Sequence, residues 1–204
     1  MYCKVFDVDY SRAADQISAI HEQLAKAEIY RGYRPVSVAL SGVCGLVGSL
    51  FQPYLVPHDN VRAWVLYWGA VALCSGLVAS SQTAFNYLWR EPEHGRRRTR
   101  RVFGQLGPSL VAGGLMTLIG VVDVELAPYL PGLWAIVFGL GVFASRPYLP
   151  RTTGWVALYF LMAGALLLIF GRGTLNPWTV GGTFAIGQFG TAAALAWNHE
   201  RVYA

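Results

Sequence analysis

Charged residues divide the chain into six long stretches that contain no Asp, Glu, Lys or Arg. They cover residues 35–58, 63–89, 102–122, 126–145, 152–171 and 173–199. A helix needs about 20 apolar residues to cross the hydrocarbon core of a bilayer, and every stretch is long enough. The pattern therefore predicts an all-α polytopic membrane protein with six transmembrane helices, at about 36–56, 61–85, 103–122, 130–145, 153–170 and 177–197.

The basic residues between these spans predict the orientation of the chain. All but two of the 16 Lys and Arg residues precede the first span, follow the last, or lie between spans two and three or four and five. The alternate connections hold only Arg62 and Arg172. Because basic loops stay in the cytoplasm, both termini are predicted to be cytoplasmic. Trp64, Trp134 and Trp178 fall at the predicted outer ends of spans, which is typical of an aromatic belt at the headgroup level.

The first 34 residues form a separate cytosolic segment, and residues 35–204 form the six-helix transmembrane domain. Within residues 10–31, apolar side chains recur at helical spacing from Ala13 to Ala27, which predicts an amphipathic helix. This helix could pack on the cytosolic ends of the spans, or it could contact another protomer or a partner protein. The segment lacks the continuous apolar core of a signal peptide, so the first span is expected to insert as an internal helix.

Composition agrees with this class. Hydrophobic residues make up 54% of the chain and charged residues 13%, against about 25% charged in ordinary soluble domains. A soluble enzyme, a disordered chain and a nucleic-acid-binding domain are therefore excluded. We expect no nucleic-acid partner.

Small residues within the spans favour close helix packing. Pairs of small residues four apart let two backbones approach, within one chain or between chains. This predicts a homo-oligomer or contact with other membrane subunits. The glycines expected to pack are Gly42, Gly45, Gly48, Gly76, Gly187 and Gly190.

A weak internal repeat suggests three helical hairpins in tandem. Trp64 and Trp134 are each followed five residues later by a glycine, Gly69 and Gly139. Both tryptophans also follow a small-residue pair by a little over 20 residues. Convergent membrane composition would produce the same pattern, so both explanations stay open.

Polar residues within the spans are few and uncharged. No acid or base lies within the six uncharged stretches, and Arg62 falls at the very edge of the second span, which argues against ion-coupled chemistry at depth. Gln52, Gln105 and Gln188 are each interpreted either as an interhelical tie or as the lining of a polar cavity. No base is placed to activate a hydroxyl, and no histidine pair has ligand spacing, so we expect no catalytic, cofactor or metal site.

A run of arginines follows the second span and is predicted to lie in a cytosolic loop. Basic clusters beside a span attract anionic lipid headgroups by about 1 kcal/mol per residue. The run is therefore predicted to bind lipid headgroups as well as to fix the topology. Its members are Arg96, Arg97, Arg98, Arg100 and Arg101.

The segment from Pro108 to the C-terminus resembles an uncharacterised family of small bacterial six-span integral membrane proteins. The similarity rests on four short motifs, at residues 107–113 (GPSLVAG), 130–134 (LPGLW), 162–165 (MAGA) and 181–187 (GGTFAIG). It implies a multi-pass protein of the bacterial cytoplasmic (inner) membrane. It implies no activity and no catalytic residues.

Two functions are compatible with these features. The first is a non-catalytic integral membrane protein that acts as a structural or accessory subunit, or as a self-associating membrane module. The alternative is a small uncharged-solute transporter, a channel or a lipid-binding membrane protein. A membrane enzyme has the least support, since only His21, Glu22, His94 and His199 could serve it.

Overall fold

The computed structural model describes residues 35–57, 59–89, 93–171 and 175–203, and in this part of the chain every regular element is helical. The predicted all-α class is therefore confirmed. The segment 1–34, with the helix predicted at 10–31, lies outside the described residues. The six long helices are α2 (Pro35–Leu55), α3 (Val61–Trp89), α4 (Glu93–Val122), α5 (Leu130–Ala144), α6 (Thr153–Phe170) and α7 (Pro177–Tyr203). Two short 3-10 helices, η1 (Val124–Tyr129) and η2 (Arg146–Tyr148), join α4 to α5 and α5 to α6.

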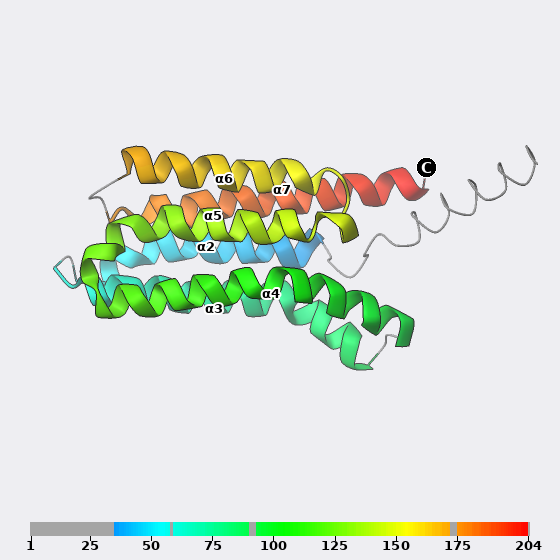
Figure 1. The fold of residues 1–204 in the computed structure, drawn as a ribbon, viewed down its shortest axis with the longest axis horizontal. Helices are drawn as coiled ribbons and strands as arrows, with labels where there is room; N and C mark the ends of the chain where they lie inside the picture. The colour runs from blue at the N-terminus through cyan, green and yellow to red at the C-terminus, as the bar shows by residue number, and fades with distance from the viewer. Residues whose placement is uncertain (1–34, 58, 90–92, 172–174, 204) are drawn as a thin grey trace, which may run out of the picture.

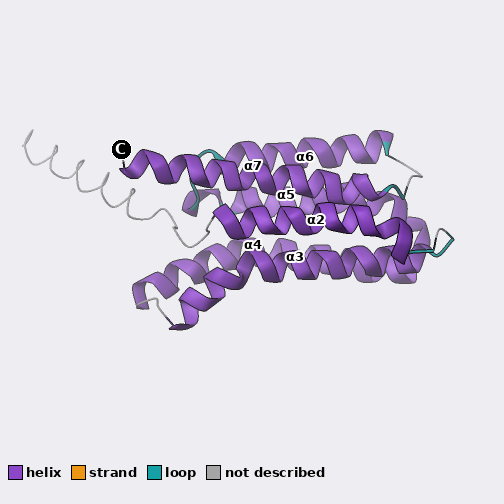
Figure 2. Cartoon of the chain, turned by 180° about the vertical axis from the view of Figure 1, so that it is seen from behind, coloured by secondary structure: helices purple, strands orange, loops and turns teal. Residues whose placement is uncertain are grey.

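The six helices form one elongated bundle (Figure 1). α2 packs most extensively against α7 and then α3, whereas α5 packs against α6 and α4. α3 and α4 lie together on one side of the bundle, run past its end and bend away from it (Figures 1 and 2). The contact between α6 and α7 is smaller than that between α5 and α6. The tandem arrangement of three hairpins stays a prediction.

Five segments of the described chain are long and apolar enough to cross a membrane. They are Pro35–Leu55, Val61–Trp89, Thr99–Val122, Val124–Ala144 and Thr153–Phe170. Their length and composition are those of transmembrane helices in a membrane protein. The cellular compartment of the protein and the orientation of its termini stay predictions. α7 has the length, at 27 residues, but its glycines, threonines and Gln188 make it less apolar. It lies along α2, where Val180, Ala185 and Leu195 are buried.

Basic and acidic residues lie mainly at opposite ends of the bundle. Arg96, Arg100, Arg101, Arg146 and Arg151 lie at the end where α2 begins, which we call the basic end. Asp59, Arg62, Asp123 and Glu125 lie at the opposite, acidic end. This distribution is compatible with the predicted orientation, in which the basic end faces the cytoplasm; the orientation itself stays a prediction.

The predicted loop around the arginine run is wrong. α4 begins at Glu93, so the run lies on the first helical turns rather than in a connection. Arginine and glutamate have high helix propensity, and no proline interrupts the chain between Glu93 and Leu106. The helix therefore continues beyond the apolar segment. Hydropathy marks where a span ends, not where its helix ends.

The first residues of α7 explain where this helix begins. Pro177 is the first helical residue, and the Trp178 backbone N–H donates to Asn176 Oδ1 at 2.9 Å. Asparagine caps the helix and proline follows where no N–H is required.

Candidate functional site

Glycines on α2 and α7 bring these two helices into close contact. A Cβ at Gly45 would lie 3.1 Å from the Gly181 carbonyl oxygen, and a Cβ at Gly181 would overlap the Gly45 carbonyl oxygen and Ser49 Oγ. Ser49 Oγ also lies 3.1 Å from the Pro177 carbonyl oxygen, to which it can donate across the contact. One turn nearer the basic end, a Cβ at Gly42 would lie 3.2 Å from Gln188 Cβ. A side chain on Gly181 would therefore displace a helix, whereas one on Gly42 or Gly45 would require its neighbours to shift by a few tenths of an ångström.

The other glycines that were expected to pack divide into two groups. Gly48 faces Val71 of α3 at 3.1 Å, and Gly187 faces the ring of Phe160 on α6. Gly76 has no atom within 4 Å of the position a Cβ would take, and the nearest to Gly190 is 3.9 Å away. Gly76 and Gly190 therefore lie on open helix faces. Gly42, Gly45, Gly48 and Gly187 lie at contacts inside the chain.

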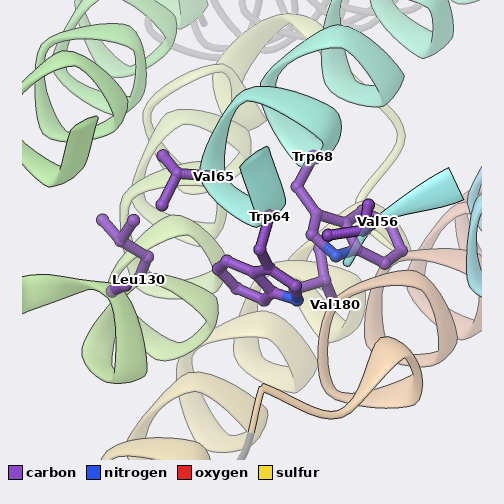
Figure 3. Packing of buried hydrophobic residues seen from close by; sticks show 7 residues of the cluster. Val56, Trp64, Val65, Trp68, Leu130 and Val180 are labelled. Atoms are coloured by element: carbon purple, nitrogen blue, oxygen red, sulfur yellow. The ribbon is translucent and has the colours of Figure 1, made fainter. Parts of the chain in front are cut away.

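Tryptophans from α3 and α5 gather at the acidic end of the bundle. Trp68 Nε1 donates to Gln52 Oε1 of α2 at 2.8 Å, and Gln52 Nε2 lies 3.4 Å from the Leu175 carbonyl oxygen. Trp64 stacks on Trp134 of α5, with ring centroids 6.1 Å apart and planes 13° from parallel. The core around Trp64 and Trp68 is closed by Val56, Val65, Leu130 and Val180 (Figure 3).

The aromatic-belt interpretation is wrong for Trp64. Its side chain is only 2% exposed, so it does not face the bilayer. Trp178, at the same end, is 50% exposed and keeps the position expected of a belt residue. A tryptophan near the end of a span has the same sequence signal whether it points inward or outward. Sequence reasoning therefore missed Trp64 as a core residue.

A cavity of about 220 Å³ lies beside this cluster. Its wall comes from the last turn of α2, the first turn of α3 and the segment that enters α7. No described residue of this wall is ionisable. The lining residues are Gln52, Pro53, Val56, Pro57, Trp64, Leu175 and Pro177.

The three predicted amides do not converge on one site. Gln52 is buried in the cluster and lines the cavity. Gln105 is exposed on α4, and Gln188 is half-buried with its Cβ beside Gly42. Gln52 thus acts as a tie between α2, α3 and the entry to α7, which is one of the two roles expected of it.

The arginine run begins beside the end of α3. The Arg96 guanidinium lies 5.7 Å from the ring centroid of Tyr87, and its Nη2 lies 3.4 Å from the Leu88 carbonyl oxygen. Arg100 Nη2 lies 3.5 Å from the Tyr87 hydroxyl. Arg96, Arg100 and Arg101 are exposed, and Arg97 and Arg98 are described only as helical backbone. Binding of lipid headgroups by this run stays a prediction.

Within the described ranges, no group of three or more His, Cys, Asp or Glu residues could hold a metal ion. The described acids of the acidic end include Asp123, which accepts a hydrogen bond from the Glu125 backbone N–H at 3.1 Å and caps η1.

No protein-family model, curated protein or solved structure matches the chain. The resemblance of residues 108–204 to a bacterial six-span family stays a prediction.

Proposed function

We propose that the chain is a non-catalytic integral membrane protein that self-associates through α4. The observation that supports this is a set of glycines on that helix that do not pack against another helix of the chain. Gly104, Gly107 and Gly114 share one helix face, and no atom lies within 4 Å of the position that a Cβ would take on any of them. Val111 and Leu118, both more than 60% exposed, complete the face. We call these five residues the α4 glycine stripe.

The α4 glycine stripe differs from the glycines of most other helices in how it is packed. Most glycines of α2, α5, α6 and α7 lie against another part of the same chain, such as Gly132 of α5 against Gly164 of α6, whereas Gly182 and Gly190 of α7 do not. In a bilayer, apolar burial does not drive helices together, so close backbone packing on small residues contributes more of the association free energy. α4 is also the least covered of the five spans, with 6% of its most apolar window buried against 44% for α2.

Mass measurement in mild detergent and in lipid nanodiscs tests the proposal. We expect the wild-type protein to show a mass of two or more chains, and a Gly107→Leu/Gly114→Leu variant to show one. Gly190→Leu is the control, because it adds a leucine to an exposed glycine on α7, away from α4. Unchanged helical circular dichroism would show that the variants fold. A strictly monomeric wild-type protein without a co-purifying subunit would contradict the proposal.

A co-purifying membrane subunit in place of a second copy would indicate the accessory-subunit form of the same function. The stripe would then contact a different transmembrane helix. Native mass spectrometry separates the two forms, because a homo-oligomer has a mass that is a multiple of one chain.

Transport of an uncharged solute has less support. It predicts a polar cavity near the middle of the membrane that Gln52, Gln105 and Gln188 would reach together. The described cavity lies at the acidic end, and Gln52 is the glutamine that lines it.

A further inference from the structure

The α4 glycine stripe continues into two arginines. Its members follow one another at spacings of three and four residues, and Arg100 and Arg96 extend this spacing by one and two turns beyond Gly104, toward the start of the helix. Side chains three or four positions apart share one face of a helix. Arg96 and Arg100 therefore lie on the face that the stripe offers to a second copy, and both are exposed.

The spacing also determines how two such helices meet. Alternation of three and four residues is typical of nearly parallel helices that stay close over their whole length. We expect every copy of the chain to have the same orientation in the membrane, because its basic segments stay on one side. Two copies related by a rotation about the membrane normal then present the same end of α4 to each other. Association through the stripe thus brings Arg100 of the two copies together.

The charge of this segment opposes the association. Residues 90–101 contain six arginines against two glutamates, so each copy brings a formal net charge of +4 whatever pairs form within the segment. Like charges held close together repel, and the repulsion is stronger beside the hydrocarbon layer than in water because the dielectric constant is lower there. An anion between the two copies would offset this repulsion and link them.

Tyr87 of α3 holds both arginines in position to bind such an anion. The Arg96 guanidinium lies 5.7 Å from the centroid of the Tyr87 ring, and Arg100 Nη2 lies 3.5 Å from the Tyr87 hydroxyl oxygen. A guanidinium has five N–H donors, and the described hydrogen bonds use one nitrogen of each arginine. Its planar fork can donate two parallel hydrogen bonds to a phosphate group.

The two arginines lie at the level expected for lipid headgroups. The apolar segment of α4 runs from Thr99 to Val122, so Arg100 stands at its edge and Arg96 one turn outside it. α3 and α4 also run past the end of the bundle and bend away from it, so the first turns of α4 lie apart from the other four long helices (Figures 1 and 2). A lipid phosphate at this level can therefore reach the arginines from the bilayer.

We propose that an anionic phospholipid binds between two copies of the chain, with its phosphate held by Arg96 and Arg100 of each copy, and that it strengthens association through the α4 glycine stripe. The inference rests on the proposed self-association and makes the lipid composition of the membrane its regulator. The phosphate belongs to a lipid because the exposed apolar surface of α4 continues from the arginines into the hydrocarbon, where acyl chains lie.

Energy transfer between donor-labelled and acceptor-labelled full chains in vesicles tests the proposal. Vesicles of phosphatidylcholine are compared with vesicles in which part of this lipid is replaced by phosphatidylglycerol, at equal protein-to-lipid ratio. We expect phosphatidylglycerol to lower the dissociation constant of the wild-type assembly about tenfold. Gly107→Leu/Gly114→Leu should show no transfer in either vesicle, because it blocks the stripe.

Removal of the two arginines should give a result that a purely structural role would not. Arg96→Gln/Arg100→Gln loses both the repulsion and the phosphate site. We expect this variant to associate more tightly than the wild type in phosphatidylcholine, and to gain nothing from phosphatidylglycerol. Arg146→Gln/Arg151→Gln is the matched control, because it removes the same charge from the basic end outside α4, and it should respond to lipid as the wild type does. Weaker association of Arg96→Gln/Arg100→Gln in both vesicles would contradict the proposal.

The remaining outcomes separate the lipid site from the proposed self-association. Equal wild-type association in both vesicles would overturn the lipid site and leave self-association standing, whereas a wild-type protein that is monomeric in both would overturn both proposals. Inorganic phosphate added to phosphatidylcholine vesicles distinguishes the two sources of the anion. An equal gain with inorganic phosphate would assign the arginines to a soluble anion, and an equal gain with sodium chloride would replace the bound lipid by charge screening. Either gain would overturn the lipid site.

Discussion

Ser49 on α2 occupies the space that any side chain on Gly181 of α7 would need. A Cβ at Gly181 would overlap Ser49 Oγ, and the same hydroxyl lies 3.1 Å from the Pro177 carbonyl oxygen. The glycine and the serine therefore depend on each other. The glycine allows the helices to approach, and the serine links the two backbones once they have done so.

Substitution of Gly181 should destabilise the bundle. In Gly181→Ala the new methyl group meets backbone as well as Ser49 Oγ, and overpacking of a rigid contact costs about 1–3 kcal/mol. We expect a melting temperature several degrees below that of the wild type, measured by circular dichroism in detergent. Gly182→Ala is the control, because its Cβ would meet Trp178 at an ordinary 3.6 Å. An equal loss in both variants would mean that the α2–α7 contact is not tight.

Gln52 should stabilise the acidic end through its bond to Trp68. In Gln52→Leu the buried Trp68 N–H loses its acceptor, which costs about 1–3 kcal/mol. The double variant Gln52→Leu/Trp68→Phe removes both partners and should recover part of that stability. Thermal unfolding of the two single variants and the double variant gives the coupling energy. Gln105→Leu, at an exposed position, should leave the melting temperature unchanged. Additive losses in the cycle would contradict the tie.

Accessibility of introduced cysteines should distinguish the two ends of the bundle. In a background in which Cys3, Cys44 and Cys74 are replaced by alanine, Arg62→Cys lies at the acidic end and Arg151→Cys at the basic end. We expect a membrane-impermeant maleimide to label only Arg62→Cys in intact cells, because basic segments stay in the cytoplasm. Arg151→Cys should react once the membrane is opened. The reverse pattern would overturn the predicted orientation.

The exposed arginines of α4 should bind anionic lipid. Each basic residue near a membrane surface adds about 1 kcal/mol of attraction to anionic headgroups. We expect phosphatidylglycerol to raise the melting temperature of the wild type more than phosphatidylcholine does. Replacement of Arg96, Arg100 and Arg101 by glutamine should remove most of that difference. Arg146→Gln/Arg151→Gln tests whether the effect belongs to α4 or to the basic end in general.

Most of the fold follows from the spacing of charge along the chain. Each of the six uncharged stretches contains most of one long helix of the described structure, since an apolar segment of this length satisfies its backbone groups best as a helix. The full lengths of α3 and α4 did not follow from the spacing of charge. The hydropathy limit at Phe103 reflects the end of the apolar segment. The helix itself begins at Glu93, where helix propensity and the contacts of Arg96 and Arg100 with Tyr87 of α3 support it.

The candidate site was much less predictable, because its contacts join residues far apart in sequence. Trp64 stacks on Trp134, 70 positions away, and no local periodicity indicates such a pair. Gln52 was recognised as an amide that needs a partner, but its partner Trp68 belongs to the next helix. The six glycines shared one sequence signal, yet the structure places Gly76 on an open face and Gly187 against Phe160. Which face a helix turns inward is decided by its neighbours.

The pairing of the first and last described helices has a consequence for the synthesis of the chain. Ser49 and Pro177 are 128 residues apart, and at 5–20 residues per second the ribosome needs roughly 6–25 s to make the intervening chain. During that interval α2 resides in the membrane without its main partner, with Gly42 and Gly45 uncovered. A ribosome that stalls before α7 would leave that face permanently uncovered, in a form that membrane quality-control proteases could recognise.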